Sequence, residues 1–176
     1  AAITGGNIEI VGARAEDLEP IVTVFKRIGV HFRLEEEMLS LEASTLLGAG
    51  RITVGLWPGF PSDLVSLVTV LATQADGQTL IHDWMYELRL FALEQLSGMR
   101  ADLFLCDPHR IIVRGPCQLV GRELDSRDLR SGMALISAAL AADGVSKISP
   151  LEIVERGYAR VVDQLKSLGA QIERQE

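Results

Sequence analysis

The chain has 176 residues, of which 48% are hydrophobic and 23% are charged, and its formal net charge is −7. This is the composition of one ordinary globular domain with a sizeable core. The acidic balance argues against a nucleic-acid partner or an anionic membrane surface, and no apolar run is long enough to span a bilayer.

The first third of the chain predicts a strand, a helix and two more strands. Residues 7–12 alternate in polarity and are flanked by glycine, which is typical of a strand. Residues 15–28 carry apolar side chains at intervals of three and four, which predicts a helix. Gly29 is suited to end that helix as its C-cap. Strands are then expected at 30–34 and 38–43.

The middle third predicts mixed helices and strands. A stiff proline-rich loop at 57–61 leads into a helix, and Ser62 or Asp63 is well placed as its N-cap. That helix is expected to stop near Gly77. The expected elements are a strand at 51–56, a helix reaching about residue 73, a helix at 87–97, and strands at 79–82, 101–106 and 111–114.

The last third repeats the plan of the middle third. Each has an aspartate before a helix, an Ala-Asp-Gly triplet after it and an arginine further on, at the same interval from the triplet glycine. A repeat of this size indicates one supersecondary unit used more than once. The matching residues are Asp63, Ala75-Asp76-Gly77 and Arg89 in one stretch, and Asp128, Ala142-Asp143-Gly144 and Arg156 in the other. The elements expected here are a helix at 129–142, a strand at 146–149, a helix at 156–168 and a closing strand at 170–174.

Three segments follow the order helix, small-residue stop and strand, at 18–32, 89–104 and 156–172. Two of them follow a complete strand–helix–strand lead-in, and the first does not. Related units of this kind commonly close on one another and bury their helices. We therefore expect a single α/β domain over residues 1–176 whose first unit is incomplete, with the missing piece upstream in a longer parent chain.

Three arginines occupy positions at or near predicted helix amino termini, where a positive charge opposes the helix dipole. They are Arg89, Arg130 and Arg156. A bound anion would compensate, because helix amino termini offer free N–H donors and arginine offers a two-pronged donor. The alternative is that these are surface arginines paired with neighbouring acidic residues, namely Glu87, Glu123 and Glu155.

Two aspartates have both an ordinary and a functional interpretation. Asp63 and Asp128 could serve as helix N-caps. Either could instead be a general base beside the arginines, within reach of a sugar hydroxyl. Met85 and Tyr86 follow a predicted strand end, where they could face a ligand or simply cover the core.

The histidines and cysteines carry weaker signals. No histidine has metal-ligand spacing, and we expect neither a metal nor a cofactor. Cys106 and Cys117 lie among apolar residues without a CxxC pair, which favours buried free thiols in a reducing compartment.

Short motifs along the whole chain carry a further signal through their order and spacing. They are Ala1-Ala2-Ile3-Thr4-Gly5-Gly6, Phe60-Pro61-Ser62-Asp63, Glu87-Leu88-Arg89, Cys106-Asp107-Pro108-His109-Arg110, Asp128-Leu129-Arg130, Gly132-Met133-Ala134-Leu135, Arg156-Gly157-Tyr158 and Leu168-Gly169-Ala170. At these residues, in order and with matching spacing, the chain resembles the carboxy-terminal half of UDP-N-acetylglucosamine enolpyruvyl transferases (UDP-N-acetylglucosamine 1-carboxyvinyltransferases).

The resemblance implies a fold and a reaction. The fold is an inside-out α/β barrel of repeated βαβαββ units with the helices inside. The reaction is transfer of the enolpyruvyl group from phosphoenolpyruvate to the 3-hydroxyl of UDP-N-acetylglucosamine, in cytoplasmic peptidoglycan synthesis. The family's reactive cysteine and an invariant lysine–asparagine pair belong to the amino-terminal half, which would be this chain's partner.

The resemblance also implies roles for individual residues. Asp63 would be the base at the sugar hydroxyl, and Asp128 would help to order the site when the two halves close. Arg130 and Arg156 would hold the carboxylate or phosphate of phosphoenolpyruvate, and Arg89 would complete the anion pocket. Met85 and Tyr86 would lie against the amino sugar.

Two other interpretations stay open. One is a non-catalytic module of the same fold that binds an anion or a partner. The other is the sister family, 3-phosphoshikimate 1-carboxyvinyltransferase. That family usually carries Lys-Glu-Ser-Asp-Arg where this chain has Ile153-Val154-Glu155-Arg156-Gly157, which makes it the weaker choice.

Overall fold

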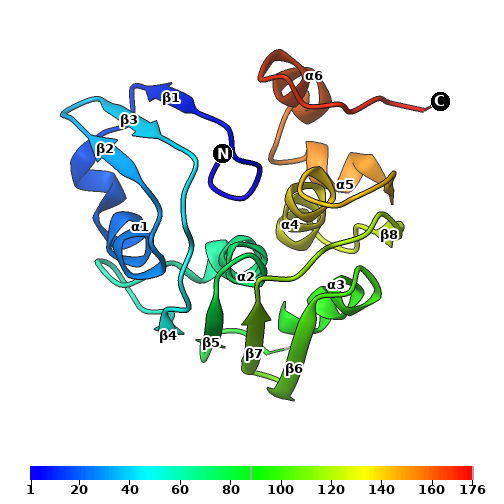
Figure 1. The fold of residues 1–176 in the computed structure, drawn as a ribbon, viewed down its shortest axis with the longest axis horizontal. Helices are drawn as coiled ribbons and strands as arrows, with labels where there is room; N and C mark the ends of the chain where they lie inside the picture. The colour runs from blue at the N-terminus through cyan, green and yellow to red at the C-terminus, as the bar shows by residue number, and fades with distance from the viewer. Residues whose placement is uncertain (88, 176) are drawn as a thin grey trace.

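The computed structural model describes residues 1–87 and 89–175, and the three predicted units follow one another around it (Figure 1). In the first unit, strand β1 (Ile8–Val11) precedes helix α1 (Ala15–Ile28) and strands β2 (Phe32–Leu34) and β3 (Met38–Leu41). The strands form an antiparallel sheet in the order β1-β3-β2. Gly29 ends α1 at φ 80°, a left-handed conformation that favours glycine. The strands and the helix predicted for the first third of the chain, and the C-cap at Gly29, are therefore confirmed.

The second unit is built on a four-stranded sheet in the order β4-β5-β7-β6. Strand β4 pairs parallel to β5, and the other pairs are antiparallel. The helix predicted at 87–97 is instead a 3-10 helix followed by one α-helical turn, and Leu88 lies outside the described residues. The elements are β4 (Gly50–Thr53), 3-10 helix η1 (Ser62–Leu64), α2 (Val65–Thr73), β5 (Gly77–His82), 3-10 helix η2 (Arg89–Glu94), α3 (Gln95–Gly98), β6 (Asp102–Asp107) and β7 (Arg110–Gly115).

The third unit departs from its prediction in three places. The elements are β8 (Glu123–Asp125), α4 (Leu129–Leu140), β9 (Lys147–Ser149), α5 (Leu151–Glu155) and α6 (Val161–Ser167). Strand β8, which the sequence did not predict, pairs parallel to β9. The single helix expected at 156–168 is wrong, because the chain leaves α5 and turns at Arg160, whose φ is 51°. The closing strand at 170–174 is also wrong, since this segment forms no ladder with the described strands.

The Ala-Asp-Gly triplets occupy equivalent places, which confirms the repeat. In each unit the backbone of the triplet aspartate pairs with the segment before the helix, and this closes a strand–helix–strand unit. Gly77 and Gly144 follow at φ 114° and 90°. The pairs are Asp76 N–H to Leu46 O (2.9 Å), Gly48 N–H to Asp76 O (2.8 Å), Asp143 N–H to Leu119 O (2.9 Å) and Gly121 N–H to Asp143 O (2.8 Å).

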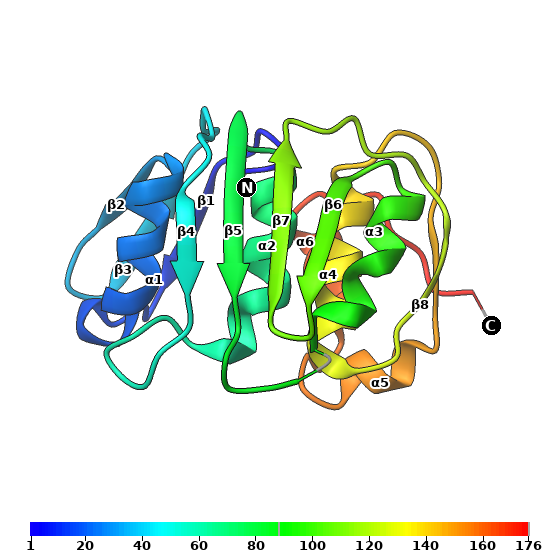
Figure 2. The ribbon, with the colours of Figure 1, turned by 90° about the horizontal axis from the view of Figure 1, so that it is seen from below.

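Helices α2 and α4 lie toward the middle of the molecule and the sheets lie around them (Figures 1 and 2). A helix buried on most sides needs small or apolar residues all round, and the sequence of α2, VSLVTVLAT, supplies them. The hydroxyls of Thr69 and Thr73 donate to carbonyls of their own helix, at Val65 and Val70. Burial of these two threonines therefore leaves neither hydroxyl without a hydrogen bond.

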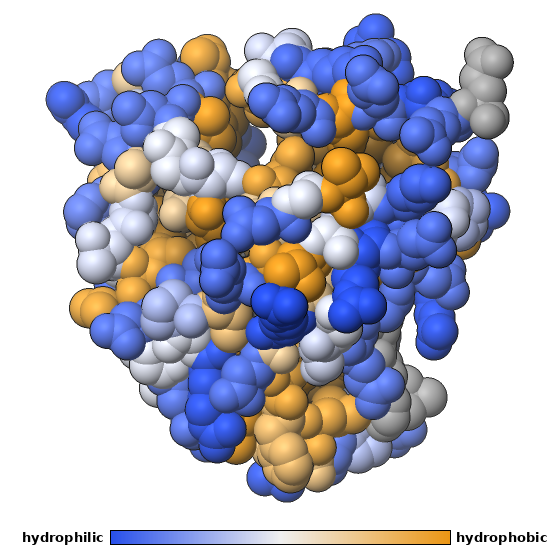
Figure 3. Space-filling view, turned by 45° about the vertical axis from the view of Figure 1, so that its right-hand side comes forward, coloured by the Kyte–Doolittle hydropathy of each residue, from blue (hydrophilic) through white to orange (hydrophobic). Residues whose placement is uncertain are grey.

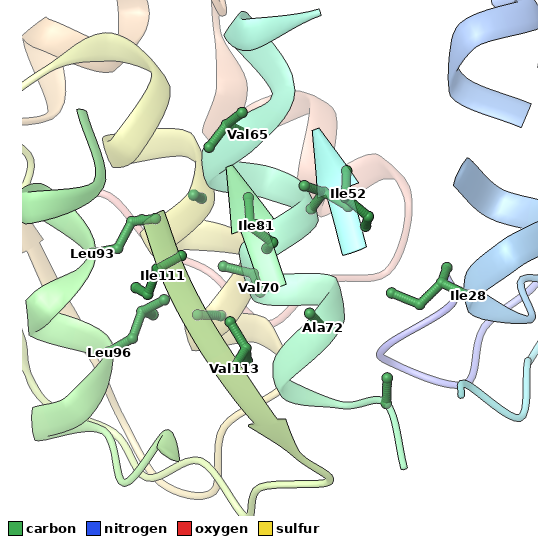
Figure 4. Packing of buried hydrophobic residues seen from close by; sticks show 14 of the residues in the cluster. Ile28, Ile52, Val65, Val70, Ala72, Ile81, Leu93, Leu96, Ile111 and Val113 are labelled. Atoms are coloured by element: carbon green, nitrogen blue, oxygen red, sulfur yellow. The ribbon is translucent and has the colours of Figure 1, made fainter. Parts of the chain in front are cut away.

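The largest cluster of buried side chains includes those between α2 and the four-stranded sheet (Figure 4), and it extends to residues of α1, β3 and α4. Ile52 from β4, Ile81 from β5 and Ile111 from β7 are almost fully buried there. Apolar residues also reach the surface around a hollow near the top of the molecule (Figure 3). None of the helices in the described parts of the chain combines the length and apolar composition that a membrane span requires.

The expectation that both cysteines are buried is wrong. Both are free thiols, but Cys106 is exposed and Cys117 is only partly buried. Strand β6 alternates between exposed and partly buried residues, and Cys106 falls on its exposed face.

Gly115, at the end of β7, is expected to tolerate no side chain. A Cβ there would lie 2.5 Å from the Thr73 carbonyl oxygen and 2.7 Å from that of Ala75. We expect Gly115→Ala to lower the free energy of unfolding by about 1–3 kcal/mol, measured by urea denaturation. Gly98→Ala is the matched control, because a Cβ there meets nothing within 4 Å. Equal stability of the two variants would contradict this account of the packing.

Candidate functional site

A carboxylate and two guanidinium groups meet where the second and third units adjoin. Asp63 lies in η1, and Arg130 lies in the first turn of α4. The Arg130 guanidinium binds the Asp63 carboxylate with two nitrogens, Nε to Oδ1 at 2.7 Å and Nη2 to Oδ2 at 2.9 Å. This two-pronged geometry fixes both groups more tightly than a single contact does.

Arg89 approaches the same carboxylate from the start of η2. Its Nη1 lies 3.4 Å from Oδ1 of Asp63, and it also donates to the hydroxyl of Ser62. The guanidinium carbon lies 4.2 Å from the centre of the Tyr86 ring, within the range of a cation–π contact. The Arg89 side chain is 13% exposed, whereas that of Asp63 is 58% exposed. One accessible carboxylate is therefore held by two cations.

These contacts rule out one alternative for each of Asp63, Arg89 and Arg130. The two arginines pair with Asp63 rather than with neighbouring glutamates. The prediction that Ser62 or Asp63 caps the helix is wrong, since Pro61 precedes η1 and no side chain caps it. The Asp63 carboxylate is turned toward the arginines and is not available to the helix.

Asp128 has the capping role. Its Oδ1 accepts hydrogen bonds from the backbone N–H groups of Arg130 (2.9 Å) and Ser131 (3.0 Å). This is the geometry of a helix N-cap. Because the cap bonds to the backbone of Arg130, it fixes the point from which that side chain reaches Asp63.

Arg156 is not brought into contact with the other two arginines. It follows the carboxyl end of α5, so the prediction that it opens a helix is wrong. It is exposed, and among the described residues its guanidinium makes no ion pair. Its neighbour Gly157 packs closely against Leu129, at the start of α4. The backbone of Arg156 therefore runs beside the helix that carries Arg130.

Met85 and Tyr86 lie on the segment between β5 and η2. Met85 is partly buried and packs against the main core, which agrees with the core-cover interpretation. Tyr86 is 51% exposed and lies against Arg89. The indole N–H of Trp84 donates to the Val54 carbonyl at 2.8 Å, which ties this segment to the end of β4.

Asp83 belongs to this cluster and was missed by reasoning from the sequence. It has no exposed surface. Its carboxylate oxygen Oδ2 lies 3.8 Å from Arg89 Nη1 and accepts a hydrogen bond from Ser62 Oγ at 2.5 Å. The sequence offered one signal for it, which is that an acidic residue follows directly after a predicted strand and precedes Trp84.

Two guanidiniums and two carboxylates meet in this cluster, so their charges balance: Arg89 lies near Asp63 and Asp83, and Arg130 pairs with Asp63. The hydrogen bond to Asp63 raises the pKa of Arg130. An anion that binds Arg130 would compete with the Asp63 carboxylate.

We expect Asp63→Asn to strengthen the binding of inorganic phosphate to the chain. The amide leaves Arg130 without its carboxylate partner and leaves Arg89 beside the buried Asp83, and a partly exposed pair of this kind is worth up to about 1 kcal/mol, or roughly fivefold in affinity. Isothermal titration calorimetry measures the change. Asp102→Asn, which removes an exposed carboxylate 3.6 Å from Arg114, should leave the affinity unchanged. Weaker phosphate binding by Asp63→Asn would contradict the competition.

A second prediction concerns His82, at the end of β5. Partial burial, then the charges of Arg51 and Arg110, lower the pKa of His82 below its ordinary 6.5, and Asp107 opposes them. The folded state therefore holds this proton less readily than the unfolded state, so stability should rise with pH in the window between that lowered pKa and 6.5. His82→Gln should flatten thermal stability across this window, and exposed His31→Gln should not. An unchanged slope in His82→Gln would disprove the assignment.

Comparison with known proteins places these residues in a family. A family model described as EPSP synthase (3-phosphoshikimate 1-carboxyvinyltransferase) matches residues 1–165. The chain is 41% identical over 184 residues to UDP-N-acetylglucosamine 1-carboxyvinyltransferase of Treponema denticola, which covers 100% of this chain and 43% of that protein. The enzyme of the same name from Treponema pallidum is 42% identical over 180 residues, covering 98% and 42%. The chain thus spans about two-fifths of the length of these relatives.

Solved structures agree on the fold. The enolpyruvyl transferase NikO from Streptomyces tendae matches with a TM-score of 0.87 and 25% identity, over 97% of this chain and 42% of that one. EPSP synthase from Acinetobacter baumannii matches with a TM-score of 0.77 and 19% identity, over 99% and 45%. The chain therefore belongs to the enolpyruvyl transferase family, has its α/β fold of repeated units, and is a homologue of UDP-N-acetylglucosamine 1-carboxyvinyltransferases.

Proposed function

We propose that this chain supplies about half of the active site of a UDP-N-acetylglucosamine 1-carboxyvinyltransferase. The single observation that carries the proposal is the accessible Asp63 carboxylate held by Arg89 and Arg130. Enolpyruvyl transfer requires a site for the anionic donor beside a base for the acceptor hydroxyl, and this cluster has the groups for both.

The donor, phosphoenolpyruvate, carries a phosphate and a carboxylate. Arginine binds such groups with two parallel hydrogen bonds. Arg130 is the more accessible of the two arginines, with 38% of its side chain exposed. In the proposal Arg130 changes partner from Asp63 to the donor, whereas Arg89 stays against Tyr86 and Ser62. Arg156 joins them on the donor when the site is complete.

Asp63 then acts on the acceptor. Once Arg130 has moved to the donor, the carboxylate takes the proton of the sugar 3-hydroxyl as the hydroxyl oxygen adds to C2 of the donor and an acid outside this chain protonates the methylene carbon. Loss of a proton from that carbon then breaks the C2–O bond to phosphate, and the phosphate leaves. The products are the enolpyruvyl ether and inorganic phosphate. Asp128 holds the start of α4, and with it Arg130, in place during this exchange. Met85 and Tyr86 lie next to the acceptor sugar.

The rest of the site is proposed to come from an amino-terminal half. The chain matches only 43% of the Treponema denticola relative. Apolar side chains around the hollow in Figure 3 support the packing of a further segment there. We place the reaction in cytoplasmic peptidoglycan synthesis, as its substrates imply.

One other function has an observation in its favour. Asp63 pairs with Arg130 inside the chain itself, which suits a non-catalytic domain that docks a partner or an anion. The sister activity on 3-phosphoshikimate is the weaker choice, because relatives of about 40% identity bear the UDP-N-acetylglucosamine name.

The test is to combine the chain with a matching amino-terminal half and to measure phosphate release from phosphoenolpyruvate and UDP-N-acetylglucosamine. Loss of a general base costs about 10²–10⁴-fold in rate, so Asp63→Ala should lower kcat by that amount. Arg130→Lys should mainly raise the KM for phosphoenolpyruvate, because lysine cannot make the two-pronged contact. The control is Arg114→Ala, which changes an exposed side chain on β7.

Two outcomes would overturn the proposal. Full activity of Asp63→Ala would remove the base. Turnover with 3-phosphoshikimate, or a tight protein complex without affinity for either phosphate ligand, would favour the other candidates.

A further inference from the structure

We propose that Asp83 is a positioning residue, whose buried carboxylate holds Arg89 and the segment carrying Met85 and Tyr86 in place beside Asp63. Asp83 follows directly after β5 and has no exposed surface. A carboxylate out of contact with water is costly unless it is fully hydrogen-bonded and paired with a cation. The contacts of the Asp83 carboxylate meet that condition, and they all lead toward the proposed site.

One carboxylate oxygen organises the segment that follows it. Oδ1 of Asp83 accepts hydrogen bonds from the backbone N–H groups of Met85 (3.1 Å) and Tyr86 (3.4 Å). These bonds fold the chain back over Asp83 immediately after the strand. They set where Tyr86 lies, and the Tyr86 ring is the surface on which the Arg89 guanidinium rests.

The other carboxylate oxygen of Asp83 contacts Ser62 and lies near the Arg89 guanidinium. Oδ2 accepts the hydroxyl hydrogen of Ser62 (2.5 Å) and lies 3.8 Å from Nη1 of Arg89. The same Nη1 donates to Ser62 Oγ and lies near Asp63. Ser62 is the residue before Asp63 in the chain. Asp83 thus fixes Arg89 by charge, and fixes Asp63 through its neighbour.

The backbone of Asp83 is anchored to a different part of the sheet. Its N–H donates to the His109 carbonyl at 2.8 Å, and its own carbonyl lies 2.7 Å from His109 Nδ1. His109 belongs to the turn between β6 and β7. The hairpin formed by β6 and β7 therefore fixes the backbone of Asp83. Because the backbone is fixed, the carboxylate can hold the long Arg89 side chain in one place.

Replacement by asparagine separates the charge from the shape. In Asp83→Asn the new side-chain amide could still accept from Met85 and Tyr86, but it would present an N–H donor toward Ser62 and Arg89. The attraction that holds the Arg89 guanidinium against Ser62 would be lost. A guanidinium displaced by about 1 Å is enough to reduce ligand-dependent activity by as much as 100-fold.

The first measurement is NMR of the arginine side chains of the isolated chain, in which the Arg89 guanidinium signal is identified by its absence from Arg89→Lys. We expect Asp83→Asn to shift this signal and to speed its exchange with solvent at least about tenfold, because the group loses a charged partner. Asp102→Asn, on exposed β6, should change neither. An Arg89 signal unaltered in folded Asp83→Asn would overturn the proposal.

Ser62→Ala is the second variant, in case Asp83→Asn does not fold. It removes the hydroxyl that links Asp83 to Arg89 but keeps the buried ion pair. The Arg89 signal should shift in the same direction. No change in the Arg89 signal of Ser62→Ala would likewise overturn the proposal.

The consequence for ligand binding rests on the proposed function, and a double-mutant cycle separates the two. Asp83→Asn should weaken phosphoenolpyruvate binding about tenfold, and this effect should vanish in an Arg89→Ala background. Independent, additive effects would show that Asp83 acts only on overall stability and would overturn the positioning role. Absence of phosphoenolpyruvate binding by the unsubstituted chain would count against the proposed function instead, and the NMR result would then decide on Asp83.

Discussion

The pairing of one carboxylate with two guanidiniums is the contact on which the rest of the site depends. Asp63 comes from the second unit and Arg130 from the third, so their two-pronged bond also ties the units together. In isolation a pair that is more than a third exposed adds little to stability. Its importance lies in placement, because it gathers opposite charges at the junction of two units, where we propose that the donor and the acceptor hydroxyl bind.

Burial of the central helices makes this placement possible. Helices α2 and α4 pack against each other with small and apolar side chains, and their amino ends carry Asp63, just before α2, and Arg130. Because interiors are close-packed, the two ends have little freedom to move apart. Two copies of one unit, packed side by side, bring equivalent corners of the fold together.

Much of this arrangement can be predicted from the sequence, and the limits have physical causes. The equivalent Ala-Asp-Gly triplets and the helix end at Gly29 depend on local backbone chemistry, and both are confirmed. The closing strand at 170–174 was wrong because a strand needs a neighbour that periodicity does not reveal. Asp63 did not cap its helix because a distant arginine competes for its carboxylate. Asp83 went unnoticed for a related reason, since only the fold shows which acidic side chain is buried.

The most direct measurement of the central claim is a crystal structure of the chain with phosphoenolpyruvate bound. The account predicts that the ligand lies between Arg89 and Arg130, that Arg130 has exchanged the Asp63 carboxylate for the ligand, and that Arg89 keeps its place over Tyr86. A ligand bound elsewhere, with the 2.7 Å contact between Arg130 and Asp63 intact, would contradict it.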